Sequence, residues 1–206
     1  MSTASPKPTR RTQEERTAET RGKLLDATLQ SLLEAGYAAT TTRRVAELAG
    51  VSQGAQTHHF PRRVDLVVAA VERLTEQRSS ALADLVDALP TDQPARTRGV
   101  LDLIWRDFSS PIFTVFVKLW VAAAEDPELY ERLVPLERRL ARQVAGTIPD
   151  LVREDARPAD LNARVTVVLS TLRGLALSGA FEPTARDPRD PWADVRPVLE
   201  RVLLSD

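Results

Sequence analysis

Residues 41–60, TTRRVAELAGVSQGAQTHHF, are the stretch that decides the fold. They predict two short helices joined by a tight turn. Thr41 and Ser52 are placed to cap the first and second helix, because a hydroxyl oxygen can accept from the free N–H groups of a first turn. Gly50 lies between the helices, where a positive φ is tolerated. This spacing is typical of a helix-turn-helix, whose second helix enters the major groove of DNA.

The second helix of this pair, which Pro61 should terminate, is too short and polar to contribute much to a core. Its residue types suit base reading. A glutamine amide can bond adenine N6 and N7, and an alanine or threonine methyl can contact the thymine methyl. A glycine would allow close approach of the backbone. We therefore predict a base-reading face made of Gln53, Gly54, Ala55, Thr57 and His58.

The chain from about residue 20 to residue 74 resembles the DNA-binding domain of the TetR (tetracycline-repressor-like) regulators. A helix-turn-helix pattern alone gives many false positives, whereas an ordered series of motifs with this spacing is more specific. Beyond Arg78 only length and helical patterning support the resemblance. The motifs are Leu24-Leu25-Asp26-Ala27, Gly36-Tyr37, Val45-Ala46-Glu47-Leu48-Ala49-Gly50-Val51-Ser52, Gly54-Ala55 and His59-Phe60-Pro61.

The resemblance implies contacts to DNA phosphates from both ends of the motif, and we assign them to Thr42, Arg43, Arg62 and Arg63. The chain also departs from the family. Regulators of this family commonly have Leu-Tyr where this chain has Gln56-Thr57. Gln56 stands at a normally inward, apolar position. Its amide must therefore find a partner inside the domain or turn toward the groove.

Five of the ten aromatic residues lie between positions 105 and 120. Such a stripe suits a solid helical core, and it equally suits the walls of an apolar ligand cavity. The resemblance implies an inducer site in this region. The predicted effector-binding residues are Trp105, Phe108, Phe113, Phe116, Trp120 and Leu172, with Arg106, Lys118 or Arg173 as polar anchors.

An apolar seam with helical spacing runs through the last two predicted helices, and small residues along it permit close helix approach. The resemblance implies that these helices pair with their counterparts in a homodimer. The alternative is that the seam belongs to the core of one chain. The predicted dimerisation residues are Leu161, Val165, Val168, Leu172, Leu175, Gly179, Val195, Val198, Leu199 and Val202.

The apolar spacing elsewhere predicts an all-α protein of about nine helices. Thr12 and Glu15 fit a capping box for the first helix, which should place Leu33 on its core face and end at Gly36. A long helix over 62–89 should join the two domains. We divide the chain into a basic arm over 1–17, a DNA-binding domain over 18–78 and an effector-binding and dimerisation domain over 79–206.

Composition narrows the classes of function. The chain has no cysteine and no run of apolar residues long enough to span a membrane, so we expect a cytoplasmic protein. Residues 1–65 hold 10 basic and 7 acidic residues, a net charge of +3, against 18 and 22, or −4, in the remainder. The basic part is the part that should meet phosphates.

Catalysis has little support, because the two histidines lie in the predicted DNA-reading helix and no catalytic set is visible. Adjacent histidines on a helix diverge by about 100° and cannot chelate one metal. We therefore expect no enzyme activity, no cofactor and no metal. The sequence predicts a homodimeric repressor that a hydrophobic small molecule releases from a pseudo-palindromic operator in double-stranded DNA. The alternative is a constitutive or architectural DNA-binding dimer.

Overall fold

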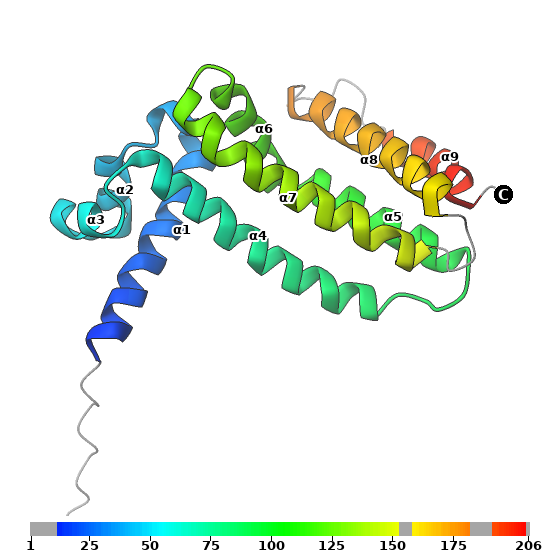
Figure 1. Ribbon diagram of the computed structural model, residues 1–206, viewed down its shortest axis with the longest axis horizontal. Coiled ribbons are helices and arrows are strands. Elements are labelled where there is room, and N and C mark those ends of the chain that lie inside the picture. Colours follow the sequence, from blue (N-terminus) through cyan, green and yellow to red (C-terminus); the bar gives the residue numbers. More distant parts are fainter. Residues whose placement is uncertain (1–11, 153–157, 182–190, 205–206) are drawn as a thin grey trace, which may run out of the picture. The chain divides into compact units, whose positions relative to one another are not determined.

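The structure is a computed structural model that describes residues 12–152, 158–181 and 191–204. Within these ranges the regular structure is α-helical, which confirms the all-α prediction (Figure 1). The helices are α1 (Gln13–Ala39), α2 (Thr42–Ala49), α3 (Gln53–His59), α4 (Arg63–Asp87), α5 (Ala95–Phe108), α6 (Pro111–Ala123), α7 (Pro127–Val152), α8 (Pro158–Phe181) and α9 (Pro191–Leu204).

The predicted basic arm over 1–17 is corrected at its C-terminal end, because α1 already begins at Gln13. The rest of the arm, residues 1–11, lies outside the described residues. The capping box is confirmed: Oγ1 of Thr12 accepts from the backbone N–H of Glu15 at 3.1 Å, and Oε2 of Glu15 accepts from the N–H of Thr12 at 2.8 Å. These bonds satisfy two donors that a helix start leaves free.

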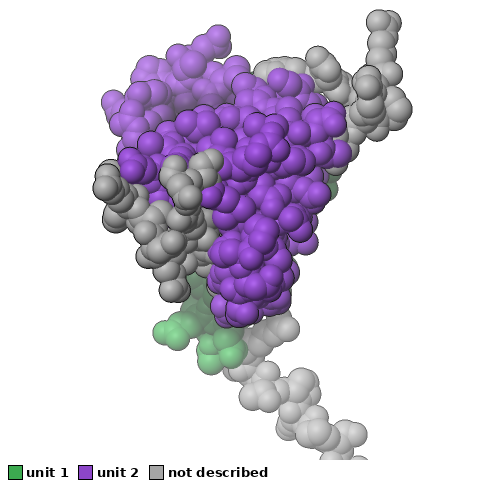
Figure 2. Space-filling model, turned by 90° about the vertical axis from the view of Figure 1, so that its right-hand side faces the viewer, with its two compact units in different colours: residues 1–71 green, residues 72–206 purple. Residues whose placement is uncertain are grey.

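The chain divides into two compact units, residues 1–71 and residues 72–206 (Figure 2). The boundary between these two units falls inside α4. The first unit has its own core, in which α1 packs against α2 and α3. Leu33, expected on the core face of α1, is instead 40% exposed. The buried core residues are Leu24, Leu25, Ala27, Val45, Phe60, Leu66 and Ala70.

A bend near the end of α1 is made at Gly36, whose φ of 74° interrupts the helical backbone. The bend is held by a short chain of hydrogen bonds. Nε of Arg44 donates to Oγ of Ser31 at 3.1 Å, and the hydroxyls of Ser31 and Thr40 lie 2.9 Å apart. Thr40 in turn donates to the Gly36 carbonyl at 2.8 Å. Because Ser31 and Thr40 are fully buried, these bonds position α2 firmly on α1.

In the second unit, α8 packs against α7 and α9 and also contacts α5 and α6 (Figure 1). Its main buried cluster joins side chains of α5, α7, α8 and α9. Among the described residues, no helix is long and apolar enough to cross a membrane.

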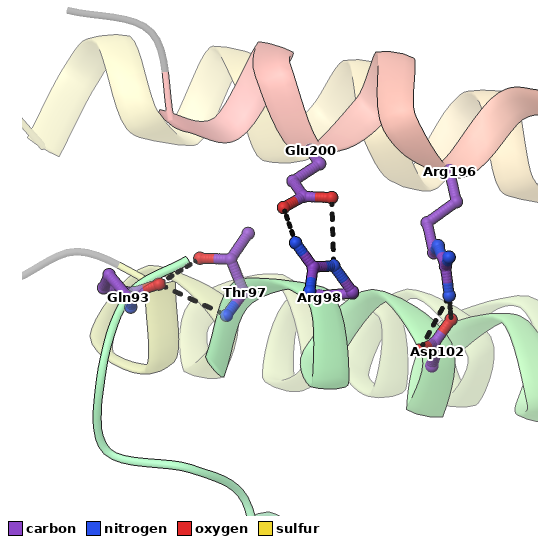
Figure 3. A network of polar contacts seen from close by, with 6 residues as sticks. All are labelled: Gln93, Thr97, Arg98, Asp102, Arg196 and Glu200. Atoms are coloured by element: carbon purple, nitrogen blue, oxygen red, sulfur yellow. Dashed lines mark hydrogen bonds and ion pairs between the residues drawn. The ribbon is translucent and has the colours of Figure 1, made fainter. Parts of the chain in front are cut away.

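Polar contacts tie α5 to α9 along one side of this cluster (Figure 3). Nε1 of Trp192 donates to Oδ1 of Asp102 at 2.8 Å, and Nη1 of Arg196 lies 3.3 Å from both oxygens of the same carboxylate. Farther along, Arg98 pairs with Glu200 at 2.9 Å. Hydrogen bonding to Glu200 raises the pKa of Arg98, so the guanidinium stays charged at any ordinary pH. These contacts set the register of α9 on α5.

Candidate functional site

The helix-turn-helix consists of α2 and α3, and each predicted terminus signal is confirmed. Oγ1 of Thr41 accepts from the N–H of Arg44 at 3.1 Å, and Oγ of Ser52 accepts from the N–H of Ala55 at 3.2 Å. Gly50 takes a left-handed conformation, with φ 65° and ψ 34°. A residue with a Cβ is strained in that region, so glycine is the residue that makes this turn at least cost.

Helix α3 ends at His59, with Phe60 as its C-cap residue directly before Pro61, as expected. Its inward side is small: Gln56 and Phe60 are buried, and His59 is partly buried. The predicted base-reading residues lie on the other side of the helix. Gln53, Gly54, Thr57 and His58 are exposed, and Ala55 is partly exposed.

The side chain of Gln56, which the sequence allowed to point either into the domain or toward the groove, points inward and forms hydrogen bonds there. The residue is 0% exposed. Its Nε2 donates to the carbonyl of Phe60 at 2.8 Å. Its Oε1 accepts from Nε2 of Gln53 at 2.8 Å and lies 3.4 Å from Oγ1 of Thr57. Two residues of the predicted reading face are therefore joined to one buried oxygen, a connection that sequence reasoning missed although the spacing of 53 and 56 permits it.

The predicted phosphate-contacting residues lie beside this face, at the starts of α2 and α4. Arg43 is exposed and pairs with Glu47 at 3.0 Å, and Arg62 pairs with Asp65 at 2.9 Å. Arg63 places its guanidinium 4.1 Å from the centroid of the buried Tyr37 ring. Exposed ion pairs contribute little stability, so Arg43 and Arg62 can exchange a carboxylate for a phosphate at small cost. Thr42 is partly buried at the first position of α2.

The two histidines of α3 have different surroundings. His59 packs near the Phe60 ring, which also carries the guanidinium of Arg21 at 4.8 Å. Burial lowers the pKa of His59, and the positive charges of His58 and Arg21 lower it further. His59 thus lies partly buried on the inner side with a lowered pKa, whereas His58 is exposed on the outer side.

The aromatic residues of α5 and α6 form contacts with one another and with α9. Trp105 stacks on Trp192 with ring centroids 5.4 Å apart. Phe113 meets Phe108 at 4.9 Å and Trp120 at 6.1 Å, both edge to face. These rings thus make one continuous apolar region with Val117 and Ala176. Phe116 is partly buried on the same helix.

Of the three predicted polar anchors, Arg173 of α8 lies against these rings. Its guanidinium carbon is 5.3 Å from the centroid of Trp120, and its Nη2 is 3.7 Å from Oε1 of Glu137. Its Nε is buried and has no hydrogen-bond partner among the described residues. An unsatisfied buried donor is costly, so a hydrogen-bond acceptor placed beside it would be bound favourably. Arg106 and Lys118 are exposed.

Five of the predicted dimerisation residues lie in the core of the second unit. Their side chains are covered by α5, α7 and α9 of the same chain. Leu175 is partly buried, Val195 and Val202 pack on the same core, and Gly179 and Val198 are exposed. The five core residues are Leu161, Val165, Val168, Leu172 and Leu199.

A second stripe on α8 faces outward, and sequence reasoning missed it. Between residues 162 and 179, the exposed described residues of α8 are all uncharged. They include Val167, which is 53% exposed, and Leu177. The available signal was that apolar or small residues occur on every side of α8, interrupted between residues 162 and 179 only by Arg164 and Arg173, a pattern that favours a helix covered on more than one side. The members at helical spacing are Ala163, Val167, Ser170, Gly174 and Leu177.

The chain is similar to known regulators over most of its length. Residues 24–70 match the family described as bacterial regulatory proteins of the tetR family, and residues 95–204 match the C-terminal part of BetI-type transcriptional repressors. The HTH-type transcriptional regulator CymR of Pseudomonas putida is 36% identical over 182 residues, which cover 85% of this chain and 86% of CymR.

Solved structures share the fold. A putative transcriptional regulator from Saccharomonospora viridis, solved in complex with choline, aligns with a TM-score of 0.67 at 17% identity over 92% of this chain and 97% of its own. The multidrug binding protein EbrR, complexed with ethidium, aligns with a TM-score of 0.64 at 23% identity over 89% and 98%. With a capped helix-turn-helix in one unit, a helical second unit, and family matches to both, this chain belongs to the TetR family of DNA-binding transcriptional regulators.

Proposed function

We propose that this protein is a homodimeric repressor that reads a pseudo-palindromic operator and leaves it when a small, largely apolar effector binds. The observation that carries the proposal is the construction of α3. Ser52 caps the helix and buried Gln56 and Phe60 anchor it, while the exposed Gln53 and Thr57 add nothing to the core. Such a helix suits a major groove, where polar side chains read base edges.

Dimerisation is supported by the outward stripe of α8, defined above. An uncharged stripe that includes Val167 and Leu177 is unusual on the surface of a chain in which 28% of residues are charged. Val198 of α9, 47% exposed, adds a further apolar side chain. A second copy related by two-fold symmetry would cover these stripes. Two α3 helices held about 34 Å apart would then fit successive major grooves.

Effector binding is supported by the aromatic contacts around Trp120 and by the unsatisfied Nε of Arg173. An apolar molecule that carries a hydrogen-bond acceptor would satisfy both features. Binding would act on DNA affinity only as far as the effector prefers one of two conformations, typically by about 1–3 kcal/mol. Fold relatives solved with choline and with ethidium, both of them cations, support small-molecule binding in this fold but not the apolar character of the effector.

The constitutive alternative also has an observation in its favour. The ring centroids of Phe108 and Phe113 lie 4.9 Å apart and those of Phe113 and Trp120 lie 6.1 Å apart. Such distances are typical of a packed core. The full-length protein should therefore be tested in two steps. Selection from a random duplex library should enrich an inverted repeat, and failure to enrich any motif would refute sequence-specific binding.

The second step measures thermal unfolding and DNA release with choline, ethidium and a panel of apolar acids and amides. A compound that raises the unfolding temperature should also dissociate the selected duplex over the same concentration range. Stabilisation without release would refute effector control by that compound. A panel without any stabilising member would favour the constitutive alternative.

A further inference from the structure

We infer that buried Gln56 is a specificity-determining positioning residue, which fixes the orientation in which Gln53 and Thr57 meet a base pair. The inference rests on the proposed DNA-reading function and goes beyond it. Gln56 itself is 0% exposed and cannot touch DNA. It acts through the hydrogen bonds that join it to its two exposed neighbours.

The direction of each hydrogen bond in this network follows from the bond at its buried end, at Phe60. The carbonyl of Phe60 can only accept, so the Gln56 atom 2.8 Å away must be the donor Nε2. Oε1 of Gln56 therefore points toward Gln53. Because that oxygen can only accept, the Gln53 atom 2.8 Å from it must be Nε2. A backbone carbonyl thus determines which end of an exposed amide faces outward.

The outward end of Gln53 then has a defined pattern. Its Oε1 is directed away from the buried oxygen, and one hydrogen of Nε2 remains after the other is donated to Gln56. One acceptor beside one donor is the complement of adenine, which presents the N6 donor and the N7 acceptor in the major groove. Thr57, 3.4 Å from the same oxygen, donates its hydroxyl hydrogen inward and leaves its methyl and lone pairs for the groove.

Packing does not require an amide at position 56. An apolar side chain can fill the same volume, at the cost in stability of leaving the carbonyl of Phe60 without this donor. What the amide adds is restriction of Gln53 before DNA arrives. A side chain that is already ordered loses less entropy on binding, and a flipped amide, which would mismatch adenine, is disfavoured.

The test uses the full-length protein and a duplex selected from a random library. Wild type, Gln53→Ala, Gln56→Leu and the double variant are titrated by fluorescence anisotropy against the selected duplex, all its single-base-pair variants and a scrambled duplex. We expect the wild type to prefer adenine at one position of each half-site by about tenfold, the scale of one bidentate contact. Gln56→Leu should remove most of that preference at the same position.

Three expected results would distinguish a positioning role of Gln56 from a purely structural one. Gln56→Leu should leave affinity for the scrambled duplex within about twofold of wild type, because the phosphate contacts are unchanged. The double variant should lose no more preference than Gln53→Ala alone, since the two residues act as one unit. The matched control Gln30→Leu, at an exposed glutamine of α1, should keep the full wild-type profile.

Each possible result of this experiment either supports or overturns the inference. An unchanged base preference in Gln56→Leu, or an equal loss of affinity for every duplex, overturns the inference while leaving sequence-specific binding intact. Failure of the wild type to select any duplex overturns both the inference and the proposed function. If Gln56→Leu unfolds at a much lower temperature than wild type, Gln56→Met, which keeps an unbranched side chain, is judged by the same criteria.

Discussion

Replacing Gly54 by alanine is expected to stabilise the protein while weakening its binding to operator DNA. Gly54 lies in α3 with ordinary helical backbone, and a Cβ built there would meet only Oγ of Ser52, at 4.0 Å. Alanine is favoured over glycine within a helix by about 1 kcal/mol. Near the helix start we expect roughly half of that or more, which corresponds to a rise in Tm of about 1–4 °C for a chain of this size.

The same methyl group should interfere with DNA. If the α3 backbone approaches the groove closely at Gly54, an added methyl moves the helix outward and lengthens the bonds from neighbouring side chains to bases. We expect the affinity for the selected operator to fall at least about tenfold, the scale of one good base contact, and the affinity for scrambled DNA to fall less. Thermal unfolding and anisotropy titration on one preparation measure both effects.

Gly50→Ala is the matched control, because Gly50 has equally open space but a φ of 65°. Its left-handed conformation should cost alanine about 1–2 kcal/mol, so this variant should be less stable than wild type. A Gly54→Ala protein that binds the operator as tightly as wild type would refute the close approach. A lower Tm for Gly54→Ala than for wild type would show that the fold itself requires glycine at this position.

The remaining predictions concern the second unit and the pH dependence. Val167→Glu should leave the fold intact but give monomers by light scattering, whereas Leu172→Ala should lower the free energy of unfolding by about 2–5 kcal/mol through a core cavity; a dimer that survives Val167→Glu would place the interface elsewhere. Trp120→Ala should abolish the response to a stabilising effector while changing operator affinity little, and loss of folding would instead make Trp120 a core residue. The lowered pKa of His59 means that the unfolded chain takes up a proton before the folded one as the pH falls. Stability should therefore be unaffected by this group above about pH 7 and should fall as the pH drops through about 6.5. Urea unfolding measured above pH 7 and below pH 6.5 should show a smaller loss of stability in His59→Gln than in wild type. An equal loss in both proteins would exclude His59 as its cause.

Features determined by residues a few positions apart were predictable from the sequence. The caps at Thr12, Thr41 and Ser52 and the turn at Gly50 all form as expected. Each depends on one side chain and on backbone groups within about four residues, so no distant part of the chain can change the outcome. The same locality explains why the bounds of α3 follow from the sequence alone.

Features that depend on distant partners were decided only by the tertiary structure. Helix α8 carries two stripes that could serve as an interface, and spacing alone does not choose between them. Packing of α5, α7 and α9 buries the stripe that contains Leu172 and leaves the one that contains Val167 exposed. The stacking of Trp105 on Trp192 likewise joins α5 to α9.

Gln56 shows within a single helix the same division between what local sequence determines and what the tertiary structure decides. Its sequence position indicated an inward direction, but whether an amide could remain there depended on finding an acceptor. That acceptor is the carbonyl of Phe60, which becomes available where α3 ends and the chain turns into the core. Local sequence thus determines where helices begin and end, whereas the face that each helix buries is determined by neighbours that only the folded chain brings together.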